Sequence, residues 1–287
     1  ATYLVYQNLF QGHPYQKSVY GRKETIEAAT VEKLEEFYRK FYTPSNCALA
    51  AVGDFKMEEM EKKVKEIFGE LEGEKPAPLK YEKAPFLGKT VNIEHEMDVK
   101  QGYLVVAMSG PDFNHNDQYS LDVLTEVLGR GVNPMLNIPL RGTVVLVHSI
   151  SMSYSAYKYG GAISIFITLD PKNINAAKRN VINFLKETAT KNYSKDDYMG
   201  ESQFYALDYL ESAKNQIKFK IQRSQEEGLV LATSLAMLIL LSEGQERGSY
   251  LDNIEKVTSS QLRKSAGRYL SRGRYVVVSI VPQKKNR

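Results

Sequence analysis

Histidines are the first residues to consider for metal or acid–base chemistry, and this chain of 287 residues has four of them. They are His13, His95, His115 and His148. None belongs to H-x-x-E-H, H-E-x-x-H or an equivalent pair of zinc ligands. An extended strand through NIEHEM (92–97) places His95 on the face opposite its flanking glutamates, which indicates a solvated strand edge. His115 lies just ahead of a predicted helix as a loop or cap residue, and His13 in GHPY is predicted to order a turn.

Motifs for nucleophilic catalysis or phosphate binding are also missing from the sequence. There is no G-x-S-x-G, and the only cysteine, Cys47, lies in the apolar run CALAAV without a neighbouring base, so a buried inert thiol is predicted. A single cysteine excludes an internal disulfide and a thiolate metal cluster. The segment LGRGVN (128–133) follows a predicted helix rather than a strand, so Gly129 and Gly131 are interpreted as helix-stop and turn residues. No self-contained catalytic site is predicted.

The composition is that of a soluble globular protein with a sizeable core, since 43% of the residues are apolar and 25% are charged. The net charge of +4 is spread over alternating basic and acidic stretches, which argues against a nucleic-acid partner. The most apolar stretch, 229–241, is shorter than the ~20 residues that cross a bilayer, so a buried helix and no membrane span are predicted. Localisation stays open between cytoplasm and periplasm.

One sequence pattern near the start of the chain returns near its end. Residues 24–52 and 252–280 align without a gap, at an offset of about 228 residues. In each copy a threonine, Thr30 or Thr258, is the expected N-cap of a helix with one apolar face, and a turn then leads into an apolar strand. The apolar faces comprise Leu34, Phe37, Tyr38 and Phe41 in the first copy and Leu262, Ala266 and Tyr269 in the second. We interpret the two segments as an internal duplication.

The duplication predicts how the chain is divided. Residues 72–88 contain three prolines among charged residues and are interpreted as a linker. They separate the C-terminal part of a first, catalytic-type repeat at 1–71 from a complete second, non-catalytic repeat at 89–287. Equal repeats would leave the first one without about 140 residues at its front.

The elements expected in both parts indicate an α+β fold, with tandem homologous domains, a mainly antiparallel sheet and flanking helices. Strands are predicted at 47–53 in the first repeat and at 89–97, 101–109, 144–156, 161–169 and 274–281 in the second. Helices are predicted at 1–10, 30–42, 56–69, 117–128, 173–190, 195–220, 226–242 and 258–270. The tyrosine-rich MSYSAYKYGG (152–161) is predicted to form paired strands and a hairpin turn.

Residues 9–54 contain, in this order, HPY, G-x-x-E-x-I, a predicted helix, Y-x-P-x-N and a predicted strand ending in VGD. With these motifs they closely resemble the pitrilysin/insulinase-like zinc metallopeptidases, which include the mitochondrial processing peptidase. A glycine turn, L-x-x-x-x-R and two apolar strands in 128–168 are similar to the family's second repeat. The resemblance implies tandem α+β domains, two pairs of which enclose a chamber where unfolded peptides are cut.

The resemblance also implies where the chemistry lies. The family's zinc is held by the two histidines of H-x-x-E-H and a later glutamate, all in the front of the first repeat, so this chain is expected to hold no cofactor. Zinc is expected only in a missing part or in a partner. The family's substrate-contacting arginine matches Arg141, and the tyrosine expected seven residues later is His148, which can also donate a hydrogen bond to an oxyanion. The competing interpretation makes Arg141 part of a structural ion pair and His148 an ordinary strand residue.

The leading hypothesis is a non-catalytic portion of such a metallopeptidase, inactive alone, that forms one wall of a peptide chamber and positions substrate. Its expected partners are an unfolded or extended peptide and a homologous catalytic domain or subunit, in a homo- or heterodimer. A structural or assembly subunit without any peptidase role is the alternative, and a stand-alone module that adds a peptide to a sheet edge is the third.

Overall fold

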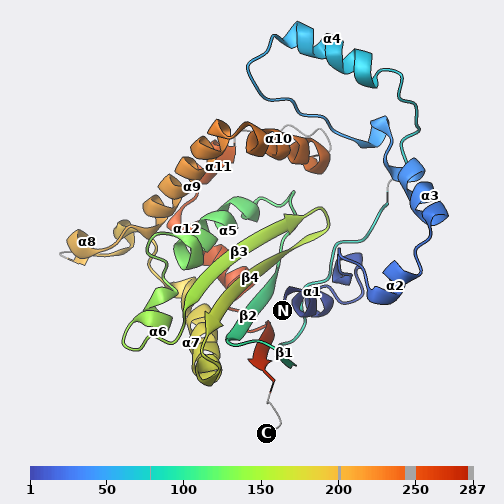
Figure 1. Ribbon diagram of the computed structural model, residues 1–287. Helices are drawn as coiled ribbons and strands as arrows, with labels where there is room; N and C mark the ends of the chain where they lie inside the picture. Colours follow the sequence, from blue (N-terminus) through green and yellow to red (C-terminus); the bar gives the residue numbers. More distant parts are fainter. Residues whose placement is uncertain (78, 200–201, 243–249, 284–287) are drawn as a thin grey trace. The chain divides into compact units, whose positions relative to one another are not determined.

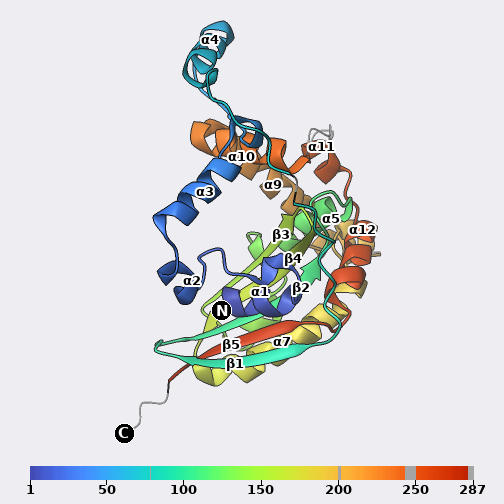
Figure 2. The same ribbon diagram turned by 90° about the vertical axis from the view of Figure 1, so that its right-hand side faces the viewer.

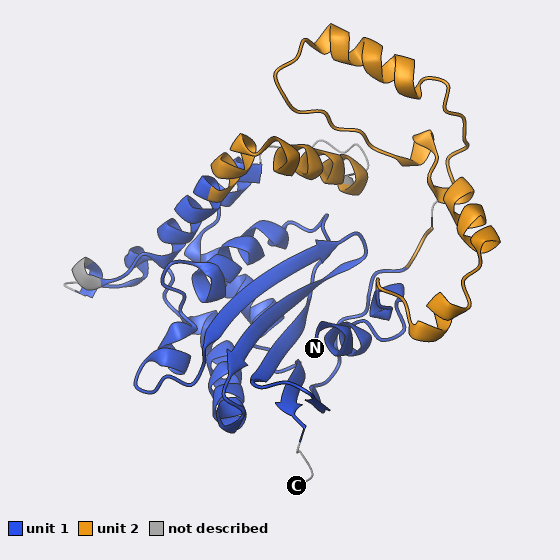
Figure 3. Cartoon of the chain, viewed as in Figure 1, with its two compact units in different colours: residues 1–18, 82–219, 248–287 blue, residues 19–81, 220–247 orange. Residues whose placement is uncertain are grey.

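The computed structural model describes residues 1–77, 79–199, 202–242 and 250–283. The chain forms two compact units, shown in Figure 3. Unit 1 comprises residues 1–18, 82–219 and 248–287, and unit 2 comprises 19–81 and 220–247. The two units are defined by contacts in space. The predicted boundaries 1–71, 72–88 and 89–287 divide the chain by its internal duplication instead, and this division stays a prediction.

Unit 1 contains one open sheet with the strand order β1-β5-β2-β4-β3 (Figure 1). The pairings of β2 with β4, β2 with β5 and β3 with β4 are antiparallel, and β1 pairs with β5 in parallel. The predicted α+β class with a mainly antiparallel sheet is therefore confirmed. The strands are β1 (Val91–Met97), β2 (Gly102–Gly110), β3 (Ser149–Tyr157), β4 (Gly160–Leu169) and β5 (Val276–Pro282). β5 follows every other strand in the sequence yet lies between β1 and β2.

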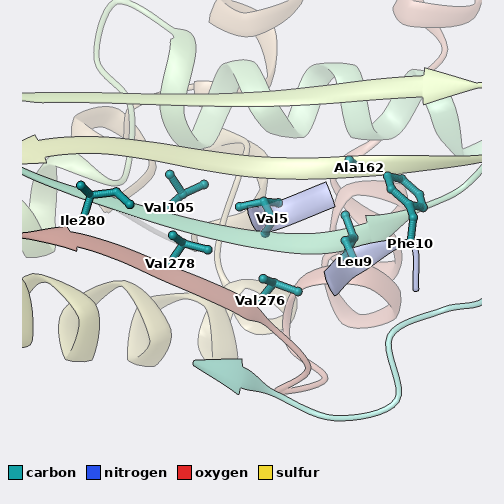
Figure 4. Close-up of a cluster of buried hydrophobic side chains, with 9 residues drawn as sticks. Val5, Leu9, Phe10, Val105, Ala162, Val276, Val278 and Ile280 are labelled. Carbon is teal, nitrogen blue, oxygen red and sulfur yellow. The ribbon is translucent and has the colours of Figure 1, made fainter. Parts of the chain in front are cut away.

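Helices cover both faces of the central strands, which explains why β2 is a nearly continuous apolar run rather than an alternating one. One face carries α5 (Asp117–Thr125), α7 (Ile174–Glu187) and α12 (Ser259–Ser265), with Leu104, Val106 and Met108 of β2 directed towards that layer. The other face carries α1 (Thr2–Leu9), as Figure 2 shows. Its Val5 and Leu9, together with Phe10, belong to a buried cluster with Val105, Val276 and Val278 (Figure 4).

The helical turn that follows α5 packs closely on β3, and a glycine makes this close approach possible. α5 continues into a helical turn over Glu126–Arg130, and a Cβ on Gly129 would come within 2.3 Å of the Met152 Cβ. Gly129 therefore permits close packing on β3 rather than stopping the helix as predicted. Gly131 does end it, with its N–H donating to the Glu126 carbonyl.

The rest of unit 1 follows the prediction with two shifts. The strand predicted at 144–156 begins only at Ser149. The backbone of Leu146 is bonded elsewhere, since its N–H donates to the Leu140 carbonyl and its carbonyl accepts from the Asn173 side chain. The helix predicted at 195–220 begins later, as α9 (Tyr209–Glu226), which continues into unit 2. The described residues of unit 1 also form the α-helices α6 (Asn137–Arg141), α8 (Ser202–Tyr205) and α11 (Tyr250–Glu255).

Unit 2 contains α2 (Lys23–Glu27), α3 (Val31–Phe41), α4 (Met57–Phe68) and α10 (Gly228–Ser242). The strand predicted at 47–53 is wrong, because an extended segment becomes a strand only beside a pairing partner, and the described residues place none there. For the same reason Cys47 is exposed rather than buried. α10 is helical as predicted, but its predicted burial is wrong, since Leu229 is 83% exposed. An apolar surface on every side of α10 makes its burial favourable, but burial also requires other residues that pack over it.

No single helix in the described ranges is long and apolar enough to cross a membrane, although one bent pair, α9 with α10, passes by length and composition.

Candidate functional site

The predicted residue Arg141 is held at the end of the short helix α6. Leu140 is fully buried and anchors the helix, and the Asn180 side chain of α7 donates a hydrogen bond of 2.8 Å to the Pro139 carbonyl. After Arg141 the chain forms a closed loop, because the N–H of Leu146 donates back to the carbonyl of Leu140 at 3.0 Å. The backbone that carries the Arg141 side chain is therefore held in place.

Arg141 and His148 are in direct contact. Nη2 of Arg141 donates a hydrogen bond to the backbone carbonyl of His148. The N–H of His148 donates to the Thr168 carbonyl at 2.7 Å, which fixes this residue against β4. The His148 side chain is 53% exposed, and its Nε2 lies 3.3 Å from Oδ1 of Asp170. The structure thus brings the two predicted residues together at the beginning of the edge strand β3.

Arg141 and His148 both have side-chain hydrogen-bond donors that a ligand could use. A guanidinium has five N–H donors, so Arg141 has further donors beyond the one on the His148 carbonyl. An imidazole with both nitrogens protonated donates one N–H to Asp170 and has a second for a ligand. Within the described residues Arg141 bonds a carbonyl and forms no ion pair, and both substrate contact and the competing structural role of Arg141 and His148 stay predictions.

The other three histidines have the structural roles expected for them. Nδ1 of His13 accepts a hydrogen bond from the N–H of Tyr15 and so orders the turn after Gly12. Nδ1 of His115 accepts from the N–H of Asp117 at the start of α5. His95 is exposed on β1, which is an edge strand. Among the described residues, no three His, Cys, Asp or Glu side chains come close enough together to hold a metal ion.

The tyrosine-rich segment forms the predicted hairpin of β3 and β4, and its side chains bind other parts of unit 1. The Tyr154 hydroxyl donates to the Pro111 carbonyl at 2.9 Å, and burial raises the pKa of this phenol. The hydroxyls of Tyr157 and Tyr6 lie 2.7 Å apart, which ties β3 to α1. This tie was missed from the sequence, where no spacing links residue 6 to residue 157.

Two carboxylates outside this site have strongly shifted pKa values. Burial raises the pKa of Asp122 on α5 to about 6, although the Tyr250 hydroxyl donates a 2.7 Å hydrogen bond to it. Burial acts in the same direction on Asp197, but hydrogen bonds from Ser259, Arg263 and two backbone N–H groups outweigh it. Together they hold the pKa of Asp197 well below its usual range.

Comparisons with known proteins give a consistent result. A family model described as the peptidase M16 inactive domain matches residues 28–199. An uncharacterized zinc protease of Mycobacterium leprae is 27% identical over 165 residues, which are 57% of this chain and 37% of the relative. A probable mitochondrial-processing peptidase subunit beta of Schizosaccharomyces pombe is 26% identical over 160 residues, covering 52% of this chain and 34% of the relative.

The fold is also found in a solved structure, a protease from Helicobacter pylori. It matches with a TM-score of 0.80 at 20% identity, over 96% of this chain and 65% of that chain. The chain therefore spans little more than a third of the two curated relatives and about two thirds of this solved chain.

Proposed function

Because the chain belongs to the peptidase M16 family through its inactive domain, we propose that it forms one wall of a peptide-processing chamber and positions substrate for a homologous catalytic domain or subunit. The family assignment confirms the resemblance to zinc metallopeptidases of the pitrilysin/insulinase type. The substrate class, the partner and the positioning role are the proposal.

One observation carries the proposal, namely the exposed His148 beside Arg141 at the beginning of an edge strand. An edge strand has backbone groups that can pair with an extended peptide. Donors at its beginning can bind a peptide carbonyl, and donors aimed at a developing oxyanion accelerate peptide cleavage. Arg141 fixes the local backbone with one donor and has further guanidinium donors for a substrate carbonyl, and His148 supplies an exposed polar side chain beside it.

The described residues contain no group of side chains that fits the metal of the family. Zinc in proteins takes three or four closely placed His, Cys, Asp or Glu ligands, and the described ranges bring no such group together. No step of the proposal passes through a metal on this chain. In the proposed complex a homologous catalytic partner supplies the zinc, and this chain contributes binding and orientation.

Reconstitution tests the proposal. This chain is dialysed exhaustively, its zinc content is measured, and it is mixed with a zinc-bearing M16 chain from the same organism while cleavage of an unstructured peptide is followed. We expect no stoichiometric zinc, no cleavage by this chain alone, and a gain on mixing. Arg141→Ala should reduce that gain at least tenfold, since one removed oxyanion-type donor costs about 10²–10³ in rate. Arg179→Ala, an exposed arginine of α7, is the control. Zinc retained with turnover by this chain alone would refute the proposal.

A structural or assembly subunit is the second candidate. Two observations favour it: Arg141 already uses one donor on a main-chain carbonyl, and residue 148 is histidine where the resembled family often has tyrosine. The reconstitution separates the two candidates, because a stable complex without any gain in cleavage supports the structural role. His148→Tyr gives a second readout. It should raise the gain if residue 148 contacts substrate, whereas with a purely structural subunit cleavage should stay at the level of the catalytic partner alone.

A further inference from the structure

Two adjoining cavities lie in unit 1 away from Arg141 and His148. The first has a volume of about 390 Å³ and lies between the beginning of α5, the end of α11 and α12. The second has a volume of about 300 Å³ and lies between residues 83–86, residues 110–115 and the helical turn Ala266–Leu270. Arg268 lines both cavities, so they are neighbours, and we call the two together the basic groove.

The charges that line the basic groove are unbalanced. Its five cations are Lys83, Lys256, Lys264, Arg268 and Arg272, and its two carboxylates are Asp112 and Asp117. Both carboxylates are already paired, Asp112 with Lys83 at 2.8 Å and Asp117 with Arg268 at 2.7 Å. The other three cations make no ion pair within the part of the chain that the structure describes. The groove therefore has three positive charges available for an anionic ligand.

Hydrogen bonds between its walls hold the basic groove in shape. Asp117 accepts from the Tyr269 hydroxyl at 2.8 Å as well as from Arg268, which joins α5 to the turn after α12. The hydroxyls of Ser120 and Ser265 are 2.6 Å apart and both are buried. On the opposite side, the N–H of Leu87 donates to Oγ of Ser109 at 2.9 Å. A groove fixed in this way loses little entropy when a ligand binds.

The groove also has an apolar contact surface. The rings of Phe86 and Tyr269 are stacked, with centroids 6.2 Å apart and planes inclined by 27°. Phe86 is 56% exposed although it lines the second cavity, so a ligand side chain that covers it removes apolar surface from water.

We propose that the basic groove binds an acidic, extended segment of polypeptide. Its carboxylates would lie on Lys256 and Lys264 in the first cavity and on Arg272 in the second, and an apolar side chain would cover Phe86. The cations are distributed over both cavities, so a single small anion reaches only part of them, whereas carboxylates spaced along a peptide reach all three. The proposal is independent of the role of Arg141 and His148.

Fluorescence anisotropy with the full chain tests this proposal. The probe is a short labelled peptide of Asp and Glu around one Phe, and the matched peptide has Asn and Gln at the acidic positions. We expect the acidic peptide to bind, the neutral one to bind at least tenfold more weakly, and the affinity to fall with added salt.

The groove variant carries Lys256→Gln, Lys264→Gln and Arg272→Gln. The control carries Lys172→Gln, Arg179→Gln and Lys186→Gln, three exposed cations beside or on α7 with the same total charge change. The groove variant should bind the acidic peptide about tenfold more weakly, at about 0.5 kcal/mol for each lost charge pair, and the control should bind within about twofold of wild type. Phe86→Ala should reduce the difference between peptides with and without Phe. Circular dichroism checks that each variant is folded.

Three outcomes would overturn the assignment. Equal weakening in the groove and control variants means that overall charge, not this groove, attracts the peptide. An acidic peptide that binds no better than its neutral match has no site here. Binding of free tripolyphosphate that depends on the groove cations, without binding of the acidic peptide, identifies a phosphate ligand in place of a polypeptide.

Discussion

Replacing Asp197 by asparagine tests the densest polar cluster in unit 1. Oδ2 of Asp197 accepts from the N–H groups of Tyr193 and Ser194 at 2.8 and 3.0 Å and from the Ser259 hydroxyl, and Oδ1 accepts from Arg263 at 2.8 Å. These bonds join residues 193–197 to α12. Asparagine has one oxygen and one NH₂, so it can satisfy only one of the two sides. The better rotamer keeps the three bonds at Oδ2 and turns its NH₂ towards Arg263.

The expected cost is that of one charge-assisted hydrogen bond, about 2 kcal/mol. Arg263 limits the cost because it is 33% exposed and also donates to Ser259 at 2.9 Å. For a unit of this size that free energy lowers the melting temperature by about 4–8 °C. Thermal unfolding followed by far-ultraviolet circular dichroism measures it, since the chain has no tryptophan. Asp196→Asn is the matched control, because Asp196 is exposed and loses the same charge.

The difference between wild type and the Asp197→Asn variant should also depend on pH. The pKa of Asp197 is lower in the folded chain than in the unfolded chain, so its contribution is fully present above the unfolded pKa of about 4. The advantage of wild type should shrink as the pH falls below that value. A melting temperature for Asp197→Asn equal to that of Asp196→Asn at neutral pH would refute this account of the cluster.

Three further predictions follow from unit 1. Gly129→Ala should destabilise it by about 2 kcal/mol, because the new methyl group meets Met152 at 2.3 Å; urea unfolding measures this, and Gly267→Ala, with its nearest contact at 3.5 Å, should cost less. The pKa of Asp122 is raised to about 6, so the free energy of unfolding of wild type should rise by up to about 3 kcal/mol relative to that of Asp122→Asn as the pH falls from about 6 to about 4. Urea unfolding measures this, and a difference between the two chains that is equal at both pH values would contradict it. Leu9→Ala should cost about 2–5 kcal/mol in urea unfolding, and an unchanged midpoint would show that α1 does not stabilise the sheet.

The duplicated motif shows how far the sequence predicts this fold. Both threonine caps form as expected: Thr30 accepts from the N–H of Lys33, and Thr258 forms a capping box with Gln261. Their surroundings differ, because Leu262 is fully buried whereas its counterpart Leu34 is 62% exposed. Capping and periodicity are local and can be read from neighbouring residues. Burial requires residues from elsewhere in the chain, which a local pattern does not contain.

Prediction of the candidate site from the sequence was limited in the same way. The family resemblance singled out Arg141 and His148 as substrate-contacting residues, and the structure places the two in contact with each other. The pattern could not predict that the guanidinium binds the main chain, because that depends on the loop closed by Leu140 and Leu146. The basic groove was missed altogether, since its residues come from four separate stretches of the sequence, and acidic residues elsewhere balance its charge.

The position of β5 in the sheet has a consequence for synthesis of the protein. β1 and β2 emerge from the ribosome early, but in the sheet they pair with β5 and not with each other. The β2–β4 and β3–β4 ladders can form first, while β1 and one edge of β2 wait without a partner until residues 276–282 appear. Unpaired strand edges promote aggregation, so this interval is the time when the nascent chain most needs a chaperone. A chain that ends before β5 would keep that exposed edge permanently.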